Sequence, residues 1–328
     1  MNYRTLGKTG LEISEISLGT WQIGGKWGSG FDDTNAAYIL NQAVDRGINF
    51  IDTADVYENG LSECAVGKLI RSRKEKIYIA TKCGRFINPH VSAGYQPNVL
   101  RGYVEQSLKN TGLDRIDLIQ LHCPPTEVYY RQEIFEEFEK LKDEGKIANL
   151  GVSVEKVEEG LKAIEYPNVS TIQIIFNMFR HRPAELLFQE AKKRNVGIIA
   201  RVPLASGLLT GKFNATTTFS DGDHRHFNRK GEAFDQGETF SGLDYNLGLE
   251  AVDQLRSIFP NEMNLVHIAL KWILMFKEVS CVIPGVSKIN QLYSNLEALS
   301  TRDLSSEELA SVKDIYNKLI RPSVHHRW

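Results

Sequence analysis

The chain has 328 residues, of which 42% are hydrophobic and 24% are charged, and its formal net charge is -2. This composition is typical of a globular protein with one large core, and the small net charge gives no reason to expect nucleic acid or an acidic membrane as a partner. No apolar run approaches the ~18 residues of a membrane span, no signal peptide is evident, and the four cysteines form no CxxC pair, so we expect a cytoplasmic protein with reduced thiols.

The predicted elements alternate between strands and helices along most of the chain. A β-hairpin over residues 3–14, with its turn at 7–10, comes first. Short apolar runs predict strands at 16–21, 48–51, 77–82, 116–122, 147–153, 171–176, 197–202 and 281–285. Helical spacing of apolar residues predicts helices at 33–45, 61–72, 98–111, 133–144, 155–164, 184–194, 247–258, 263–277, 288–298 and 306–319. A long polar loop over 206–245 follows the seventh strand.

This alternation predicts one α/β domain over residues 1–328. Strands that alternate with helices form a parallel sheet, and eight such units predict a closed (β/α)8 TIM barrel. The barrel would carry an N-terminal β-hairpin, a long loop after strand seven and additional helices. A doubly wound open sheet is the alternative, and it is less favoured because the glycines of 22–31 match no G-x-G-x-x-G pattern.

Polar side chains follow three consecutive predicted strands. Asp52 follows the second strand, Lys82 ends the third and His122 ends the fourth, while Tyr57 lies in the loop after Asp52. Because barrel enzymes place their active sites at the carboxyl ends of the strands, we expect these four side chains to converge there. Strand alternation puts Lys82 on the same face as Ala80.

Together the four groups could form a general acid. A free tyrosine titrates near ~10, a neighbouring ammonium group lowers that pKa, and an aspartate can hold the lysine in place. A histidine beside the tyrosine can position a carbonyl oxygen, but the hydride must come from a cofactor. Taken singly, Asp52 could cap the next helix, Tyr57 could lie on the rim, Lys82 could be a surface lysine and His122 a core histidine.

Seven segments carry a resemblance to a known family. They are Leu18–Trp21, Phe50–Tyr57, Ala80–Lys82, Asp117–His122, Gly151–Ser153, Gly207–Lys212 and Ile283–Gly285 with its continuation to Asn295. On these segments, over about residues 3–300, the chain resembles the aldo-keto reductase superfamily, and it looks most like the bacterial reductases of the inositol-cluster or general-stress type. The resemblance implies that Tyr57 donates a proton and that Lys82 and Asp52 adjust the pKa of Tyr57. It also implies that His122 orients the carbonyl.

The resemblance also implies an extended NADP(H) across the top of the barrel. The positions that match the family's cofactor contacts are Gly19, Thr20, Trp21, Asp52, Ser153, Gln173, Arg201, Pro203, Leu204, Ser206, Gly207, Lys212, Gly285, Ser287, Lys288, Gln291 and Asn295. Ser287 could instead cap the helix that begins at Lys288.

Three positions depart from the family's usual pattern. Val154 replaces an asparagine, so one contact to the carboxamide is expected to be missing. Arg201 replaces an aromatic residue that stacks on the nicotinamide, and its positive charge is expected to favour the reduced cofactor and so carbonyl reduction. Ser287 replaces a frequent arginine, which leaves Lys288 and Lys212 to supply the charge that would favour NADPH over NADH.

The expected substrate wall consists of Trp21, Trp27, Tyr57, Phe86, His122 and Cys123. Cys123 could equally face the surrounding helices. Within the loop 206–245, the pair His224 and His226 lacks flanking metal ligands, so we expect no metal and a solvated, mobile loop.

The sequence therefore predicts an NADPH-dependent reductase of an aldehyde or ketone, either a sugar or a small reactive carbonyl. An NADP(H)-binding regulatory or redox-sensing subunit with little turnover is the first alternative. A metal-dependent barrel hydrolase that uses Asp52 and His122 is the second, and it lacks the further ligands that such a site needs.

Overall fold

Eight parallel strands form the centre of the computed structural model, which describes residues 1–25, 30–260 and 263–328. Along the sheet they run in the order β10-β9-β8-β7-β6-β5-β4-β3. Their bounds are β3 (Leu18–Gly19), β4 (Phe50–Asp52), β5 (Tyr78–Cys83), β6 (Leu118–His122), β7 (Leu150–Ser153), β8 (Val169–Ile175), β9 (Gly197–Arg201) and β10 (Val279–Val282). Parallel bridges from Ile16 to Val282 and from Gly19 to Gly285 join the first strand to the last. The predicted closed barrel is confirmed.

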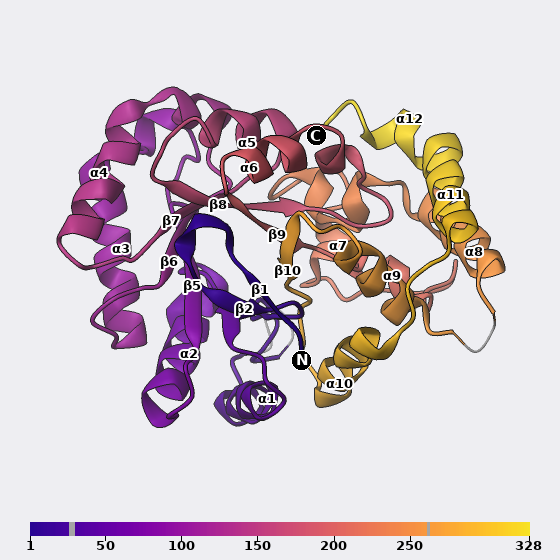
Figure 1. Ribbon diagram of the computed structural model, residues 1–328, viewed down its shortest axis with the longest axis horizontal. Helices are drawn as coiled ribbons and strands as arrows, with labels where there is room; N and C mark the ends of the chain where they lie inside the picture. The colour runs from indigo at the N-terminus through magenta and orange to yellow at the C-terminus, as the bar shows by residue number, and fades with distance from the viewer. Residues whose placement is uncertain (26–29, 261–262) are drawn as a thin grey trace.

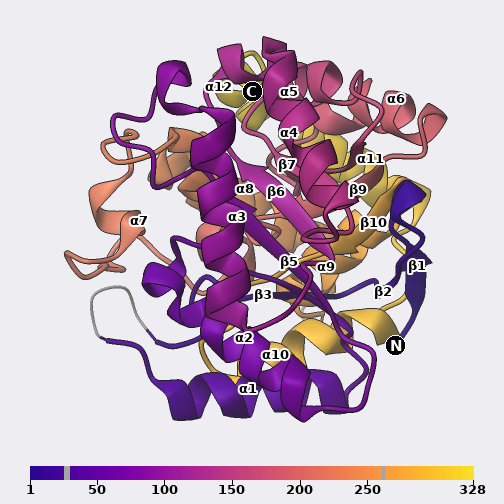
Figure 2. The same cartoon turned by 90° about the vertical axis from the view of Figure 1, so that its left-hand side faces the viewer.

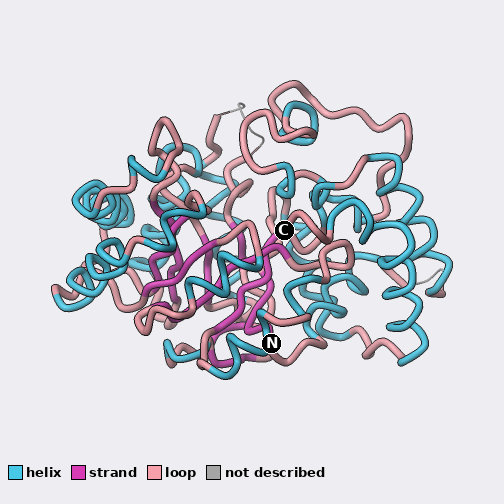
Figure 3. Tube along the Cα trace, turned by 90° about the horizontal axis from the view of Figure 1, so that it is seen from above, coloured by secondary structure: helices cyan, strands magenta, loops and turns pink. Residues whose placement is uncertain are grey.

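Helices surround the strands on the outside (Figures 1 and 3). The longer ones are α1 (Asp33–Asp45), α2 (Leu61–Ser72), α3 (Pro97–Thr111), α4 (Gln132–Asp143), α5 (Val157–Ala163), α6 (Leu187–Lys193), α8 (Tyr245–Ile258), α9 (Leu265–Leu274), α10 (Ile289–Glu297) and α11 (Ser306–Ile315), and α12 (Arg321–Val324) is short. Most lie within a few residues of their predicted bounds. The last strand ends earlier than the predicted 281–285, because Pro284 has no N–H group to continue the ladder. None of the helices in the described ranges is long and apolar enough to cross a membrane.

The N-terminal hairpin closes one end of the barrel. Its strands β1 (Tyr3–Thr5) and β2 (Glu12–Ser14) pair antiparallel, as predicted. Leu6 and Ile13 of the hairpin are fully buried in a small apolar cluster that fills the barrel, with Phe50, Tyr78, Ala80, Leu118, Ile199, Cys281 and Ile283. Gly7 has a φ of 49°, and a Cβ there would collide with the backbone nitrogen of Gly197 at the start of β9. The hairpin therefore sits at the amino-terminal ends of the strands.

The segment expected to be a solvated loop, 206–245, contains several short helical turns. They are η6 (Ala205–Thr210), α7 (His224–Phe227), η7 (Gln236–Glu238) and η8 (Phe240–Gly242), and Figure 2 shows α7 at one side of the barrel. His224, Asn228 and Phe240 are buried. The Asn228 side-chain oxygen accepts hydrogen bonds from the backbone N–H groups of Ala233 and Phe234. The expectation of a solvated loop is therefore wrong for this part of the segment.

Candidate active site

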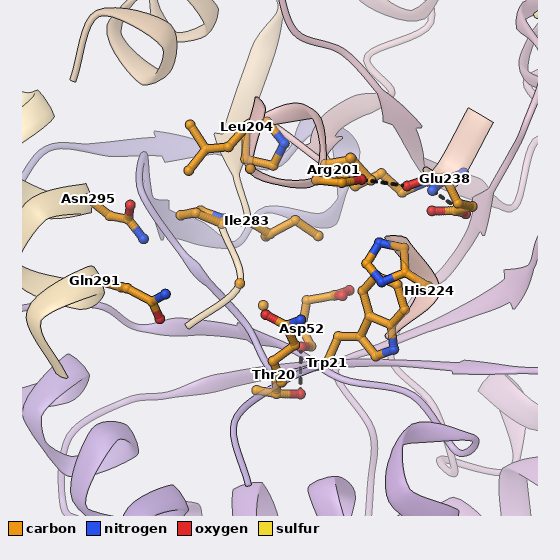
Figure 4. Close-up of a pocket in the computed structure, with 18 of the residues that line it drawn as sticks. Thr20, Trp21, Asp52, Arg201, Leu204, His224, Glu238, Ile283, Gln291 and Asn295 are labelled. Carbon is orange, nitrogen blue, oxygen red and sulfur yellow. Dashed lines mark hydrogen bonds and ion pairs between the residues drawn. The ribbon is translucent and has the colours of Figure 1, made fainter. Parts of the chain in front are cut away.

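A cavity of about 690 Å³ opens at the carboxyl ends of the strands, opposite the hairpin. Its wall includes the last residues of β3, β4, β6, β7 and β9, which are Gly19, Asp52, His122, Ser153 and Arg201. Figure 4 shows its extended shape, with Gln291 and Asn295 of α10 at one end and Trp21, His224, Arg201 and Glu238 at the other. This is the end of a barrel at which enzymes of this fold carry out their chemistry.

Asp52, Lys82 and Tyr57 form a hydrogen-bonded chain at the bottom of this cavity. The Lys82 Nζ lies 2.5 Å from the Asp52 Oδ1 and donates hydrogen bonds to the Thr53 carbonyl at 2.8 Å and to the Tyr57 hydroxyl at 3.3 Å. Lys82 is buried behind Tyr57, whereas Asp52, Tyr57 and His122 reach the cavity wall. The structure thus brings together all four residues of the predicted tetrad.

Two glutamines complete the partners of the buried aspartate. The Asp52 Oδ2 accepts hydrogen bonds from the Gln120 Nε2 at 3.1 Å and from the Gln173 Nε2 at 2.8 Å. The Ser153 hydroxyl donates to the Gln173 Oε1 at 3.5 Å. A buried ion pair is tolerated only when its remaining polar atoms have such partners. Burial opposes the charge on Lys82, but Asp52 and Tyr57 outweigh it and raise the pKa of the lysine.

Tyr57 lies between two aromatic rings. Its ring centroid is 6.4 Å from that of Trp21 and 6.1 Å from that of His122, which meets it edge-on. Burial raises the pKa of Tyr57, and the nearby Lys82 charge lowers it by a smaller amount. The Lys82 charge thus lowers the pKa of this tyrosine, as expected, but the larger effect of burial leaves that pKa raised overall. The phenol remains protonated at neutral pH and holds a proton that it can donate.

His122 is a neutral imidazole in this environment. Burial, followed by the positive charges of Lys82, Arg85 and Arg201, holds the pKa of His122 well below its usual value. Within the described ranges, the His122 Nδ1 is buried and has no hydrogen-bond partner. A neutral imidazole at the cavity wall has one N–H group that can donate to a carbonyl oxygen.

Arg201 is held by two carboxylates, which the sequence analysis missed. Its Nη1 lies 2.5 Å from the Glu238 Oε1 and its Nη2 lies 3.0 Å from the Glu155 Oε2. The same Nη2 donates to the backbone carbonyl of Val154 at 3.0 Å. The expected bias toward the reduced cofactor depends on an uncompensated positive charge, and these ion pairs remove that premise. Glu238 is 37 residues from Arg201 in the chain, so no local pattern could have predicted the contact.

The far end of the cavity is formed by the loop after β10 and by α10. Asn295 is buried, and its Nδ2 has no hydrogen-bond partner among the described residues. The Ser287 hydroxyl and backbone N–H both donate to the Gln291 Oε1, at 3.2 and 2.8 Å, so Ser287 belongs to the cap of α10. Ser287 is not part of the cavity wall, whereas Lys288 and Gln291 are.

The other predicted cofactor positions line the cavity. They are Gly19, Thr20, Trp21, Asp52, Ser153, Gln173, Arg201, Pro203, Leu204, Ser206, Gly207, Lys212, Gly285 and Asn295. Further wall residues that were not predicted from the sequence follow strands or belong to the loop after β9, and they include Val56, Arg85, Arg225, Phe234 and Glu238. His224 also lines the wall, with its ring centroid 4.8 Å from that of Trp21.

Two residues of the expected substrate wall lie elsewhere. Phe86 is 43% exposed and stacks on Tyr103, with 6.3 Å between the ring centroids, and it does not line the cavity. Cys123 is buried behind the wall, where its Sγ lies 3.6 Å from the Arg201 Nη2. Both placements in the substrate wall are therefore corrected. The predicted wall residue Trp27 lies outside the described residues.

The family model described as the aldo/keto reductase family matches residues 15–317 of this chain. The aldo-keto reductase YhdN of Bacillus subtilis is 31% identical over 329 residues, which cover 99% of this chain and 96% of that protein. An aldo-keto reductase of Schizosaccharomyces pombe whose name specifies NADP(+) is 27% identical over 311 residues, covering 92% of this chain and 87% of that protein. The solved structure of the glycerol dehydrogenase AKR11B4 from Gluconobacter oxydans superposes with a TM-score of 0.78 at 30% identity, covering 97% of this chain and 96% of that one.

Proposed function

Since this chain belongs to the aldo/keto reductase family, we propose that it reduces an aldehyde or a ketone to the alcohol with NADPH as its reductant. Family membership makes it an oxidoreductase that acts on carbonyl compounds. The observation that carries the proposal is the chain of Asp52, Lys82 and Tyr57, which ends at a phenol on the cavity wall beside the neutral His122.

The cavity fits a nicotinamide cofactor at its far end and along its length. The buried Asn295 Nδ2, which has no partner among the described residues, offers a hydrogen bond, and a Cβ at Gly285 would meet no atom within 4 Å, which leaves room for a ligand. Lys212 and Lys288 lie at the wall, and within the described ranges neither ammonium group forms an ion pair, so both are free to bind phosphate groups of NADPH. When bound, the cofactor supplies the hydride, which side chains cannot provide.

The protein's own residues supply the proton and hold the carbonyl. The Tyr57 hydroxyl donates its proton to the carbonyl oxygen, and the Lys82 ammonium group then stabilises the phenolate that remains. Asp52 keeps Lys82 charged and in place. The neutral His122 donates a hydrogen bond to the same carbonyl oxygen and so orients the substrate.

The substrate is proposed to be a small polar carbonyl compound, either a sugar or a small reactive aldehyde. The wall of the cavity combines aromatic rings, such as Trp21 and Phe234, with charged groups, such as Arg85 and Glu238. A mixed wall of this kind suits a polar molecule with a small carbon skeleton. The glycerol dehydrogenase with a similar structure acts, by its name, on a small polyol, and this supports the assignment.

The test is to measure NADPH oxidation against a panel of aldehydes, ketones and sugars, with NADH in parallel, for the wild type and Tyr57→Phe. We expect Tyr57→Phe to keep its affinity for NADPH and to lose about 10²- to 10⁴-fold in kcat, because the general acid is removed. Tyr130→Phe is the matched control, since Tyr130 is 67% exposed and does not line the cavity.

Two results would count against the proposal. A Tyr57→Phe variant as active as the wild type would show that the proton comes from elsewhere. A wild type that binds NADPH but reduces no member of the panel would favour the regulatory or redox-sensing alternative.

A further inference from the structure

Arg85 is a cationic residue of the cavity for which the proposed mechanism has no use. It follows β5 by two residues and lines the same cavity as Tyr57 and His122. Its side chain is partly buried. In the described part of the chain, no hydrogen bond, ion pair or ring contact reaches its guanidinium group.

The other two arginines of the cavity wall are both paired. Arg225 makes two contacts with the carboxylate of Asp223, at 2.6 and 2.9 Å. Arg201 lies between Glu238 and Glu155, at 2.5 and 3.0 Å. The carboxylates of Glu238 and Glu155 are thus in direct contact with Arg201, and their charges reach Arg85 only over a longer distance, where they raise its pKa. Arg85 stands apart from the other wall arginines because no carboxylate among the described residues lies within ion-pair distance of it.

The position of Arg85 places its charge close to the reacting carbonyl. Its loop follows β5, and β5 is the direct neighbour of β6, which ends at His122. Arg85 and His122 both line the cavity, and the charge of Arg85 contributes to lowering the pKa of His122. A substrate whose carbonyl oxygen lies between Tyr57 and His122 would therefore extend toward Arg85 on this side of the cavity.

We propose that Arg85 binds an anionic group, a carboxylate or a phosphate, on the carbonyl substrate. The guanidinium group presents five N–H donors in a planar fork that matches the oxygens of both groups. The assignment rests on the proposed function, since it names the class of substrate that the same site reduces. An arginine that acted only through the pKa of His122 would affect charged and neutral substrates alike, and this difference makes the assignment testable.

The experiment compares kcat/KM for matched pairs of substrates in the wild type, Arg85→Gln and Arg85→Lys. Succinic semialdehyde is paired with its neutral methyl ester, and glyceraldehyde 3-phosphate is paired with glyceraldehyde. We expect Arg85→Gln to lower kcat/KM by about 10- to 100-fold for the anionic member of a pair and to leave the neutral member within about twofold. Arg85→Lys should recover part of the loss, and the pair with the larger effect distinguishes carboxylate from phosphate.

Arg225→Gln is the matched control, because it removes an arginine from the same wall whose charge is already paired. This control should leave the ratio of anionic to neutral kcat/KM unchanged. Equal losses on both members of each pair in Arg85→Gln, or no loss at all, would overturn the role of Arg85 and leave the reductase function standing. A wild type inactive on every charged and neutral carbonyl would overturn the proposed function, and the role of Arg85 with it.

Discussion

Asp55 is a buried acid that stands three residues after Asp52 and has an unusual environment. It is 3% exposed, and among the described residues neither of its carboxylate oxygens has a hydrogen-bond partner. The neighbouring Glu63 uses its own oxygens for Thr81 and Asn110, at 2.5 and 2.7 Å. Burial, with a contribution from the charge of Glu63, raises the pKa of Asp55 to about 8.

This raised pKa makes stability depend on pH in a defined direction. Between the usual pKa of 3.8 and about 8, folded Asp55 keeps a proton that the unfolded chain releases, so the free energy of unfolding falls as pH rises. We expect Asp55→Asn to remove this dependence. Between pH 5 and pH 7, the free energy of unfolding of the variant, relative to that of the wild type, should rise by on the order of 1.4 kcal/mol per pH unit.

Urea unfolding of both proteins at pH 4, 6 and 8 measures the effect. Asp253→Asn, at an exposed carboxylate, is the control, and its stability should differ from that of the wild type far less than the stability of Asp55→Asn does. A stability difference between Asp55→Asn and the wild type that is the same at all three pH values would contradict the assignment.

At the scale of single residues, the sequence could predict the tetrad but not its surroundings. Asp52 and His122 end apolar strands and Lys82 is the second-last residue of the strand between them, so the parallel sheet brings them to the same end. Arg85 lies in a loop and Glu238 in the short helical turn η7, and neither segment is long enough for periodicity to indicate which way a side chain points. The state of Tyr57 was also beyond the sequence, because the burial that raises its pKa depends on the whole cavity wall.

Among the elements, the loop after β9 depends on Trp328 for its position. The Trp328 Nε1 donates to the Asp235 Oδ1 at 2.8 Å, and the indole packs so closely on Gly242 that a Cβ there would collide with it. The guanidinium carbon of Arg180 lies 4.2 Å from the Trp328 ring centroid on the same cluster. Trp328 therefore holds the segment 235–242, from which Glu238 reaches Arg201 at the cavity.

We expect Trp328→Ala to loosen this segment without unfolding the barrel. The lost packing leaves a void beside Gly242, so local opening should cost less free energy. Hydrogen exchange of the amides in 235–242 should become about tenfold faster, and NADPH should dissociate faster as the loop opens more often.

Trp328→Phe serves as the matched variant, since it keeps an aromatic ring but loses the hydrogen bond to Asp235 and should show a smaller effect. Unchanged exchange in 235–242 for Trp328→Ala would show that the indole does not hold the loop.

The elements themselves were largely predictable, and this loop was the exception. The helices and strands of the barrel follow from periodic apolar residues, and α1 and α2 have the predicted bounds. The segment 206–245 has no such period, because its buried residues contact distant parts of the chain rather than one face of a regular element. Its polar composition therefore predicted solvation where the structure shows packing against Trp328 and Trp21.

For the molecule as a whole, the hairpin and the cavity lie at opposite ends of one barrel. Eight alternating strands and helices were enough to predict the barrel, and alternation along β5 put Ala80 on the same face as Lys82. Ala80 belongs to the apolar cluster that fills the barrel. The bridges from Ile16 and Gly19 to the last strand could not be predicted, because closure depends on the stagger of all the strands.

This separation predicts that stability and catalysis can be changed independently. Leu6→Ala should lower the free energy of unfolding by about 2–5 kcal/mol, because it leaves a cavity inside the barrel at the hairpin end. Chemical denaturation measures the loss, and kcat of the folded protein should remain within about twofold. Leu186→Ala is the control, since Leu186 is 48% exposed and should change stability by less than about 0.5 kcal/mol. A large loss of kcat in folded Leu6→Ala would show that the two ends are coupled.

The buried pair of Lys82 and Asp52 has one more consequence for the proposed reduction of an aldehyde. A free amine condenses with an aldehyde to form an imine, and a lysine next to a reactive carbonyl would be consumed by the protein's own substrate. Lys82 is protected in two ways, because Asp52 keeps it protonated and without a lone pair, and because it lies behind Tyr57 rather than on the cavity wall. The ion pair proposed to stabilise the Tyr57 phenolate would thus also protect the site from inactivation by an aldehyde substrate.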